Sequence, residues 1–135
     1  MLQASSESIK EIAAALVEAS AEIGGVVKGA NNPFFKSKYA DLASIIELVK
    51  APLEKQGIVI LQPIRTDENG NAFLETKLLH GSGEFISSFM PLDVSGKEQT
   101  LGSRITYFRR YQLQSMLSIP AIDDDGEMAM QRERR

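Results

Sequence analysis

The amino-acid sequence predicts an α+β fold in which two helices precede a three-stranded antiparallel β-meander and one helix follows it. Apolar residues recur at intervals of three and four near the N-terminus and again over residues 99–116, a spacing typical of amphipathic helices. Between these regions, residues 58–92 are rich in β-branched and alternating apolar side chains and contain Asn-Gly and Gly-Ser-Gly turn signals. A length of 135 residues suits one core. We assign that domain to residues 1–120 and an acidic, mixed-charge C-terminal tail to residues 121–135.

The first helix is predicted over Ser5–Val27. Ser5 or Ser6 is suited to cap its N-terminus. Its apolar side chains form a narrow seam with polar flanks, which favours packing on the chain's own sheet or on a neighbouring subunit. The members of this seam are Ile9, Ile12, Leu16, Ala19, Ile23 and Val26.

The segment Lys28–Tyr39 is predicted to be a loop, because Asn31-Asn32-Pro33 has the composition of a turn. Two adjacent phenylalanines in it are interpreted as anchors to the core. Lys36 and Lys38 are candidates for phosphate contacts, and Tyr39 is a candidate for stacking or hydrogen bonding.

A second helix is predicted over Asp41–Lys50, with Asp41 favourably placed at its N-terminus. Pro52 is expected to break or kink it, because proline lacks the backbone N–H that a helix interior needs. A final turn over Leu53–Gln56 is expected to end at Gly57 in a left-handed cap.

Three strands are predicted, and a linker over Asp93–Lys97 leads from them to the last helix. Pro63 cannot donate a hydrogen bond to a neighbouring strand, so the first strand is expected at a sheet edge or with a bulge. The strands are Ile58–Arg65, Ala72–His80 and Glu84–Leu92.

The last helix is predicted from about Gln99 to Met116 and concentrates basic and aromatic side chains. On a helical projection Arg109 falls beside the apolar stripe, and Arg110 falls on the far side. Cations beside flat rings supply the phosphate contacts and base stacking that bind a single nucleic-acid strand. An amphipathic helix that packs on the core with a solvated basic side has the same pattern, so both interpretations stay open on this stretch alone. The stripe consists of Leu101, Ile105, Phe108 and Met116, and the neighbouring face carries Arg104, Tyr107 and Tyr111.

The charge distribution identifies two positive segments in a chain whose net charge is −3. Residues 28–65 and 94–120 each carry a net charge of +3. The local field, rather than the total charge, governs attraction to a polyanion. Both segments are therefore candidate parts of a nucleic-acid-binding surface.

Composition excludes several classes of protein. The chain has no cysteine and one histidine, His80, which rules out a thiolate zinc site and disfavours a Ser–His triad. No apolar run reaches the roughly 18–20 residues that span a bilayer, and the N-terminus lacks the pattern of a signal peptide. We therefore expect a reduced, cytosolic compartment and no membrane partner.

Two alternative functions remain open at this point. The acidic run Asp123-Asp124-Asp125 with Glu127 is compatible with a divalent metal site of a nuclease, although its spacing does not fit an EF-hand and no general base stands out. A solvated acidic run is the simpler interpretation. The second alternative is a protein-interaction scaffold whose arginines pair with carboxylates of a partner.

Four stretches, taken in order and with their spacing, resemble the ERF superfamily, the essential recombination function proteins of bacteriophages. The resemblance extends from about Asn32 to Glu127 and so covers most of the chain. The stretches are FKSKYADLASIIELVKAPLEKQGI, TKLLHGSGE, GSRITYFRRYQL and DDDGE.

The resemblance implies a β-β-β-α core of the annealing-recombinase type, assembled into rings or helical filaments. It implies ATP-independent annealing of complementary single-stranded DNA with no catalytic residue and no cofactor, in the cytoplasm of the bacterial host. The implied partners are single-stranded DNA, the annealed duplex, further copies of the chain, and a phage exonuclease or a host single-strand-binding protein. DNA is expected in a basic groove between the sheet and the following helix. Carried onto this sequence, the DNA-binding residues are Lys36, Lys38, Tyr39, Lys97, Arg104, Thr106, Tyr107, Arg109, Arg110 and Tyr111.

Overall fold

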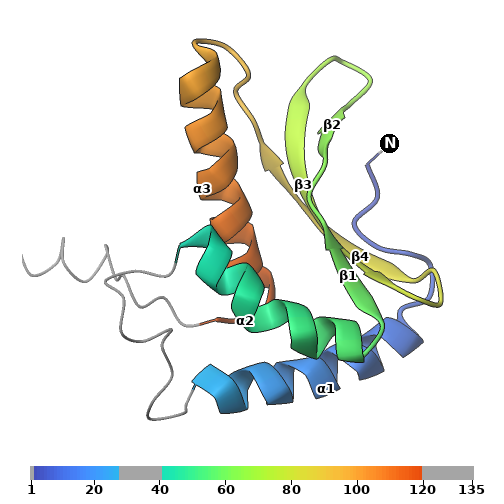
Figure 1. The fold of residues 1–135 in the computed structure, drawn as a ribbon. Coiled ribbons are helices and arrows are strands. Elements are labelled where there is room, and N and C mark those ends of the chain that lie inside the picture. The colour runs from blue at the N-terminus through green and yellow to red at the C-terminus, as the bar shows by residue number, and fades with distance from the viewer. Residues whose placement is uncertain (1, 28–40, 120–135) are drawn as a thin grey trace, which may run out of the picture.

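The computed structural model describes residues 2–27 and 41–119, and all labelled elements of Figure 1 lie in these two ranges. The predicted fold class, α+β with an antiparallel sheet, is confirmed. None of the helices in the described ranges has the length and apolar character required to cross a membrane. In chain order the elements are α1 (Lys10–Val27), α2 (Leu42–Lys55), β1 (Ile58–Leu61), β2 (Ile64–Thr66), β3 (Ala72–His80), β4 (Phe85–Pro91) and α3 (Glu98–Met116).

The sheet contains four strands in the described ranges rather than the predicted three, because the expected first strand divides into β1 and β2. Both pair antiparallel with β3, and β4 pairs antiparallel with the other edge of β3. The division falls at Gln62 and Pro63, where proline has no N–H for the ladder. The carbonyl of Pro63 still accepts a hydrogen bond of 2.9 Å from the backbone N–H of Glu75. The expected edge position of this region is confirmed.

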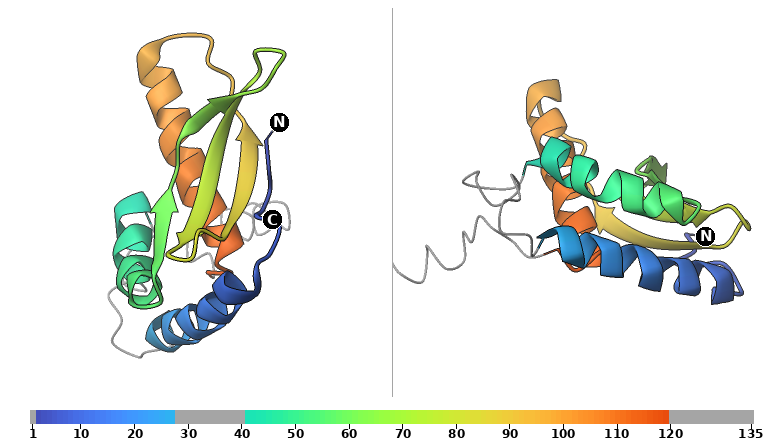
Figure 2. Two further views of the ribbon diagram at one scale, coloured as in Figure 1. Left: turned by 90° about the vertical axis from the view of Figure 1, so that its right-hand side faces the viewer. Right: turned by 60° about the horizontal axis from the view of Figure 1, so that its bottom comes forward.

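The predicted start of the first helix at Ser5 is wrong, since α1 begins at Lys10. Ser5 instead forms an isolated antiparallel bridge with Ile86. Next to this bridge, the backbone N–H of Ser87 donates to the carbonyl of Ala4 over 2.7 Å. The N-terminal segment thus runs alongside the edge of β4 through an isolated bridge (Figure 2).

The cap of α1 comes from a distant residue rather than from Ser5 or Ser6. The Glu84 carboxylate, just before β4, accepts hydrogen bonds from the backbone N–H groups of Glu11 and Ile12, at 2.8 and 2.9 Å. The bond from Ile12 is the main reason that the pKa of Glu84 is lowered. A carboxylate at this position satisfies unpaired donors and complements the positive end of the helix.

Helix α2 continues through Pro52 to Lys55, so of the predicted break or kink at Pro52 the break is wrong, and so is the predicted helix end at Lys50. Pro52 is buried against the core, and its missing N–H costs the helix a single backbone bond. The predicted place of Asp41 at the N-terminal end of this helix is confirmed: it is the N-cap and accepts from the backbone N–H of Ser44 over 2.8 Å, which lowers the pKa of Asp41. The helix ends before Gly57, whose φ of +76° is left-handed as expected.

The core lies between the helices and one face of the sheet, and α1 packs on α2 and β3 of its own chain. The opposite face carries no helix in the described part of the chain (Figure 2). The buried core cluster is Ile12, Ala15, Ala19, Ile23, Ile45, Val49, Leu53, Ile58, Leu78, Leu113, Leu117 and Ile119.

Candidate nucleic-acid interface

Helix α3 holds most of the predicted DNA-binding residues, and its bounds agree closely with the predicted 99–116. Its buried residues, Gln112 and Leu113, lie in its C-terminal half. The predicted apolar stripe is therefore only partly correct, because its residues are half-buried. The fully buried contact of α3 with the rest of the protein is made by one polar residue, Gln112, and one apolar residue, Leu113. The half-buried residues of that stripe are Leu101, Ile105, Phe108 and Met116.

The outward face of α3 carries a pair of stacked tyrosines. The rings of Tyr107 and Tyr111 have centroids 5.5 Å apart and planes inclined by 30°. Both side chains are about half exposed, at 48% and 52%. The guanidinium of Arg110 lies over the Tyr107 ring at 5.6 Å. A cation beside two exposed rings is a surface on which bases stack and phosphates are neutralised.

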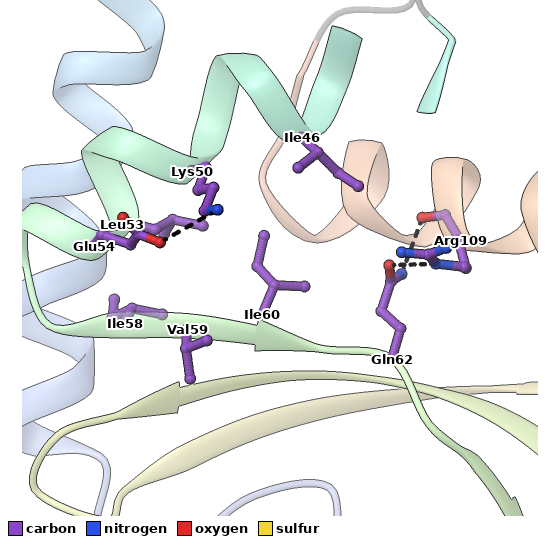
Figure 3. Close-up of a pocket in the computed structure, with 9 residues that line it drawn as sticks. All are labelled: Ile46, Lys50, Leu53, Glu54, Ile58, Val59, Ile60, Gln62 and Arg109. Carbon is purple, nitrogen blue, oxygen red and sulfur yellow. Dashed lines mark hydrogen bonds and ion pairs between the residues drawn. The ribbon is translucent and has the colours of Figure 1, made fainter. Parts of the chain in front are cut away.

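Arg109 points the other way, toward the sheet, as its predicted place beside the apolar stripe implies. Its Nε donates to Oε1 of Gln62 over 3.0 Å (Figure 3). The amide nitrogen of Gln62 in turn donates to the carbonyl of Arg109 over 3.2 Å. The pair fixes the guanidinium at the junction of α3 with the chain that links β1 to β2.

This junction continues into the core as a polar network that sequence reasoning did not identify. Gln62 Nε2 donates to Thr76 Oγ1 over 2.9 Å, and Thr76 Oγ1 donates to Gln112 Oε1 over 2.8 Å. Gln112 Nε2 lies 3.4 Å from Ser88 Oγ. Buried polar groups need such partners. The network therefore fixes both the rotation of α3 and the position of Arg109.

Arg104 is engaged with the connection that precedes α3. Its guanidinium donates to the carbonyl of Asp93 and, over 3.4 Å, to that of Ser95. Hydrogen bonds from Ser95, with the charge of Arg104 as a smaller cause, lower the pKa of Asp93. Lys97 is the exposed N-cap residue of α3, and Thr106 Oγ1 donates to the Gly102 carbonyl over 3.1 Å.

Lys36, Lys38 and Tyr39 lie outside the described residues, and so does the acidic run at 123–127. The structure therefore places the helix residues of the predicted site on or next to α3, with the tyrosines and Arg109 on different sides of it, but does not place the loop. Among the described residues, no three His, Cys, Asp or Glu side chains gather in a way that suits a metal ion.

The helix-free face of the sheet carries a second charged cluster, which the sequence did not signal. Glu75 is only 3% exposed and accepts from Ser87 Oγ at 2.6 Å and from Arg65 Nε at 2.9 Å. Lys77 Nζ lies 3.8 Å from the same carboxylate and 4.3 Å from the centre of the Phe85 ring. Burial alone raises the pKa of Glu75, but these hydrogen bonds and positive charges outweigh it and lower the pKa.

Fold and surface together define an α+β protein in which a basic, tyrosine-bearing helix packs on an antiparallel sheet. The profile of the ERF superfamily matches residues 12–135, so the chain belongs to that superfamily. The resemblance inferred from the sequence is thereby confirmed. No curated protein and no solved structure gives a match.

Proposed function

We propose that this protein binds single-stranded DNA of any sequence and anneals complementary strands in bacteriophage homologous recombination. The supporting observation is the exposed Tyr107–Tyr111 stack beside Arg110, on the α3 helix of an ERF-superfamily chain. Annealing breaks no covalent bond. The proposed activity therefore requires no catalytic residue, nucleotide or metal ion.

The proposed contacts divide between backbone and base. Arginines on α3 neutralise phosphates, and the tyrosine rings stack on bases from one side. Because phosphates are alike in every sequence, these contacts do not select one. Bases that are held through their phosphates and by stacking on one face keep their pairing edges free for a second strand. The contacts on and next to α3 come from Lys97, Arg104, Thr106, Tyr107, Arg109, Arg110 and Tyr111, and the loop residues Lys36, Lys38 and Tyr39 complete the proposed surface.

Repetition of the subunit is part of the proposal. Each phosphate contact on a single strand adds about 0.7 to the logarithmic salt slope, so one chain with a few cations binds weakly. Copies arranged along one strand raise the overall affinity without new kinds of contact. Val59, Leu61 and Ile64 on the edge strands β1 and β2 are exposed, at 42–49%, and this apolar edge supports self-association into rings or filaments.

The proposal includes the cellular context that the family implies. We place the activity in the cytoplasm of the bacterial host. There a phage exonuclease supplies single strands, or a host single-strand-binding protein hands them over.

A strand-annealing assay tests the proposal directly. Complementary oligonucleotides carrying a fluorophore and a quencher are mixed with the protein in the presence of a chelator and without nucleotide. We expect annealing faster than the spontaneous reaction, and slower annealing with Arg110→Gln. Lys10→Gln on α1 removes the same charge away from α3 and should leave the rate unchanged. Absence of stimulation, or strand cleavage that depends on Mg²⁺, would refute the proposal; electron micrographs with and without DNA test the assembly.

A further inference from the structure

A pocket of about 360 Å³ lies between α2, β1 and α3 (Figure 3). Ile46 and Leu53 of α2 and Ile60 of β1 supply apolar walls. Arg109 lies at the end next to α3, and Lys50 lies at the opposite end, where its Nζ pairs with the Glu54 carboxylate over 3.9 Å. A concave, mostly apolar space with a few charged groups has the composition of a ligand site, and its volume lies within the usual range of roughly 300–1,000 Å³.

The side-chain amide of Gln62 in this pocket is already engaged in hydrogen bonds, so the Arg109 guanidinium is the group that can attract a ligand. The side-chain oxygen of Gln62 accepts from Arg109, and its nitrogen donates to Thr76 and to the carbonyl of Arg109. Within the described part of the chain, the Arg109 guanidinium donates to Gln62 through Nε. The two terminal amino groups of Arg109 therefore remain available for an anion. The pocket therefore offers apolar walls with a fixed cation at one end and the Lys50–Glu54 ion pair at the other.

The pocket also borders α3, the helix that carries the residues proposed to bind DNA, because Arg109 lines it. Residues 109, 110 and 111 follow one another around α3 at about 100° per residue. Tyr111 faces outward, Arg110 lies on the next side, and Arg109 reaches the pocket. The position of Arg110 toward α2 agrees with its charge contributing, after the hydrogen bonds from Ser44, to the lowered pKa of Asp41. A strand that crosses α3 from the tyrosines to Arg109 thus reaches a residue that lines the pocket.

We infer that this pocket takes one nucleobase of single-stranded DNA, with the adjoining phosphate on Arg109; this inference rests on the proposed function. A flat, largely apolar ring joined to an anion matches apolar walls beside a guanidinium. An apolar side chain of a protein partner fits the walls equally well but leaves the cation without a counter-charge. Because the amide of Gln62 is already engaged, any of the four bases is accepted. One base per subunit is held in this way until a complementary strand competes for it.

The test compares wall-filling variants on two kinds of strand. Ile46→Trp fills the pocket from α2, and Ile60→Trp fills it from β1. Val17→Trp is the matched control, since Val17 on α1 is 69% exposed and does not line the pocket. Full-length protein is titrated by fluorescence anisotropy with a mixed-sequence strand and with an abasic strand of equal phosphate number. Circular dichroism and urea midpoints verify that each variant is folded.

We expect either filling variant to weaken binding of the base-containing strand by between about fivefold and a hundredfold. Binding of the abasic strand, and all binding by Val17→Trp, should be unchanged. Equal losses on both strands, or no loss from either folded variant, would overturn the base pocket. A change in molar mass by light scattering with equal losses on both strands would overturn it in favour of a second copy of the chain. Unchanged binding of both strands by Arg110→Gln would instead overturn the proposed function itself.

Discussion

Replacing Arg109 by alanine separates the structural role of this residue from its proposed contact with DNA. The change removes the hydrogen bond from Nε to Gln62 Oε1, which measures 3.0 Å. The backbone carbonyl remains, so the bond that it accepts from Gln62 is kept. Hydrogen bonds to charged groups contribute about 1.5–3 kcal/mol. Because both side chains are only half-buried, we expect the free energy of unfolding to fall by about 1.5 kcal/mol, the lower end of that range.

A double-mutant cycle with Gln62→Ala isolates this bond. Each single change removes the same interaction, so the double variant should lose less than the sum of the two single losses, with a coupling of about 1.5 kcal/mol. Urea unfolding followed by circular dichroism measures all four proteins. The measurements are repeated at several protein concentrations, because self-association makes stability depend on concentration. Strictly additive losses would refute the structural role given to Arg109.

The contact with DNA is read from the salt dependence of the same variant. Loss of one phosphate contact lowers the slope of log affinity against log salt by about 0.7 per bound subunit. Arg110→Ala should lower the slope by the same amount, although Arg110 does not take part in the bond to Gln62. Two folded variants that keep the wild-type slope would show that neither arginine contacts a phosphate.

Three further predictions concern the core network, the tyrosine stack and the buried carboxylate. Thr76→Val leaves Gln112 Oε1 without its donor and should lower the free energy of unfolding by about 1–3 kcal/mol in urea, whereas Thr76→Ser should not. Replacing both Tyr107 and Tyr111 by leucine should weaken binding in anisotropy titrations by about 1–3 kcal/mol per base that stacks on a ring, with an unchanged salt slope. The pKa of Glu75 is lowered from 4.5, so its contribution to stability is complete above that value and is lost as the pH falls below it. The unfolding free energy of Glu75→Gln should therefore depend less on pH in that acidic range than the wild type, and equal slopes would contradict the assignment.

Features that depend on local patterns could be predicted from the sequence. The strand Ala72–His80 has the predicted bounds, and α3 begins one residue before the predicted Gln99. Hydrophobic periodicity and turn residues are local properties, so these elements can be predicted without tertiary information. The inward position of Arg109 followed from helical geometry in the same way.

Features that depend on distant contacts could not be predicted. The cap of α1 comes from Glu84, more than seventy positions away in the chain. Gln112 is buried because Thr76 donates to it from the central strand, and nothing near Gln112 in the sequence indicates such a partner. Pro52 remains inside α2 because core packing offsets the missing backbone bond. In each case contacts between distant parts of the chain, rather than the local sequence, determine the structure.

The arrangement of side chains around α3 restricts the path that a DNA strand can take. A strand running parallel to the helix axis would meet either the outward tyrosines or the inward Arg109, but not both, because they lie on opposite sides of the helix. A strand crossing over α3 meets Tyr111, Arg110 and Arg109 in succession. The inward end of that path is fixed by the hydrogen bonds of Gln62, which in turn depend on Thr76 in the core. Damage to the Thr76–Gln112 bond should therefore misplace one end of the DNA path and leave the tyrosine stack in place, so that affinity falls while base stacking persists.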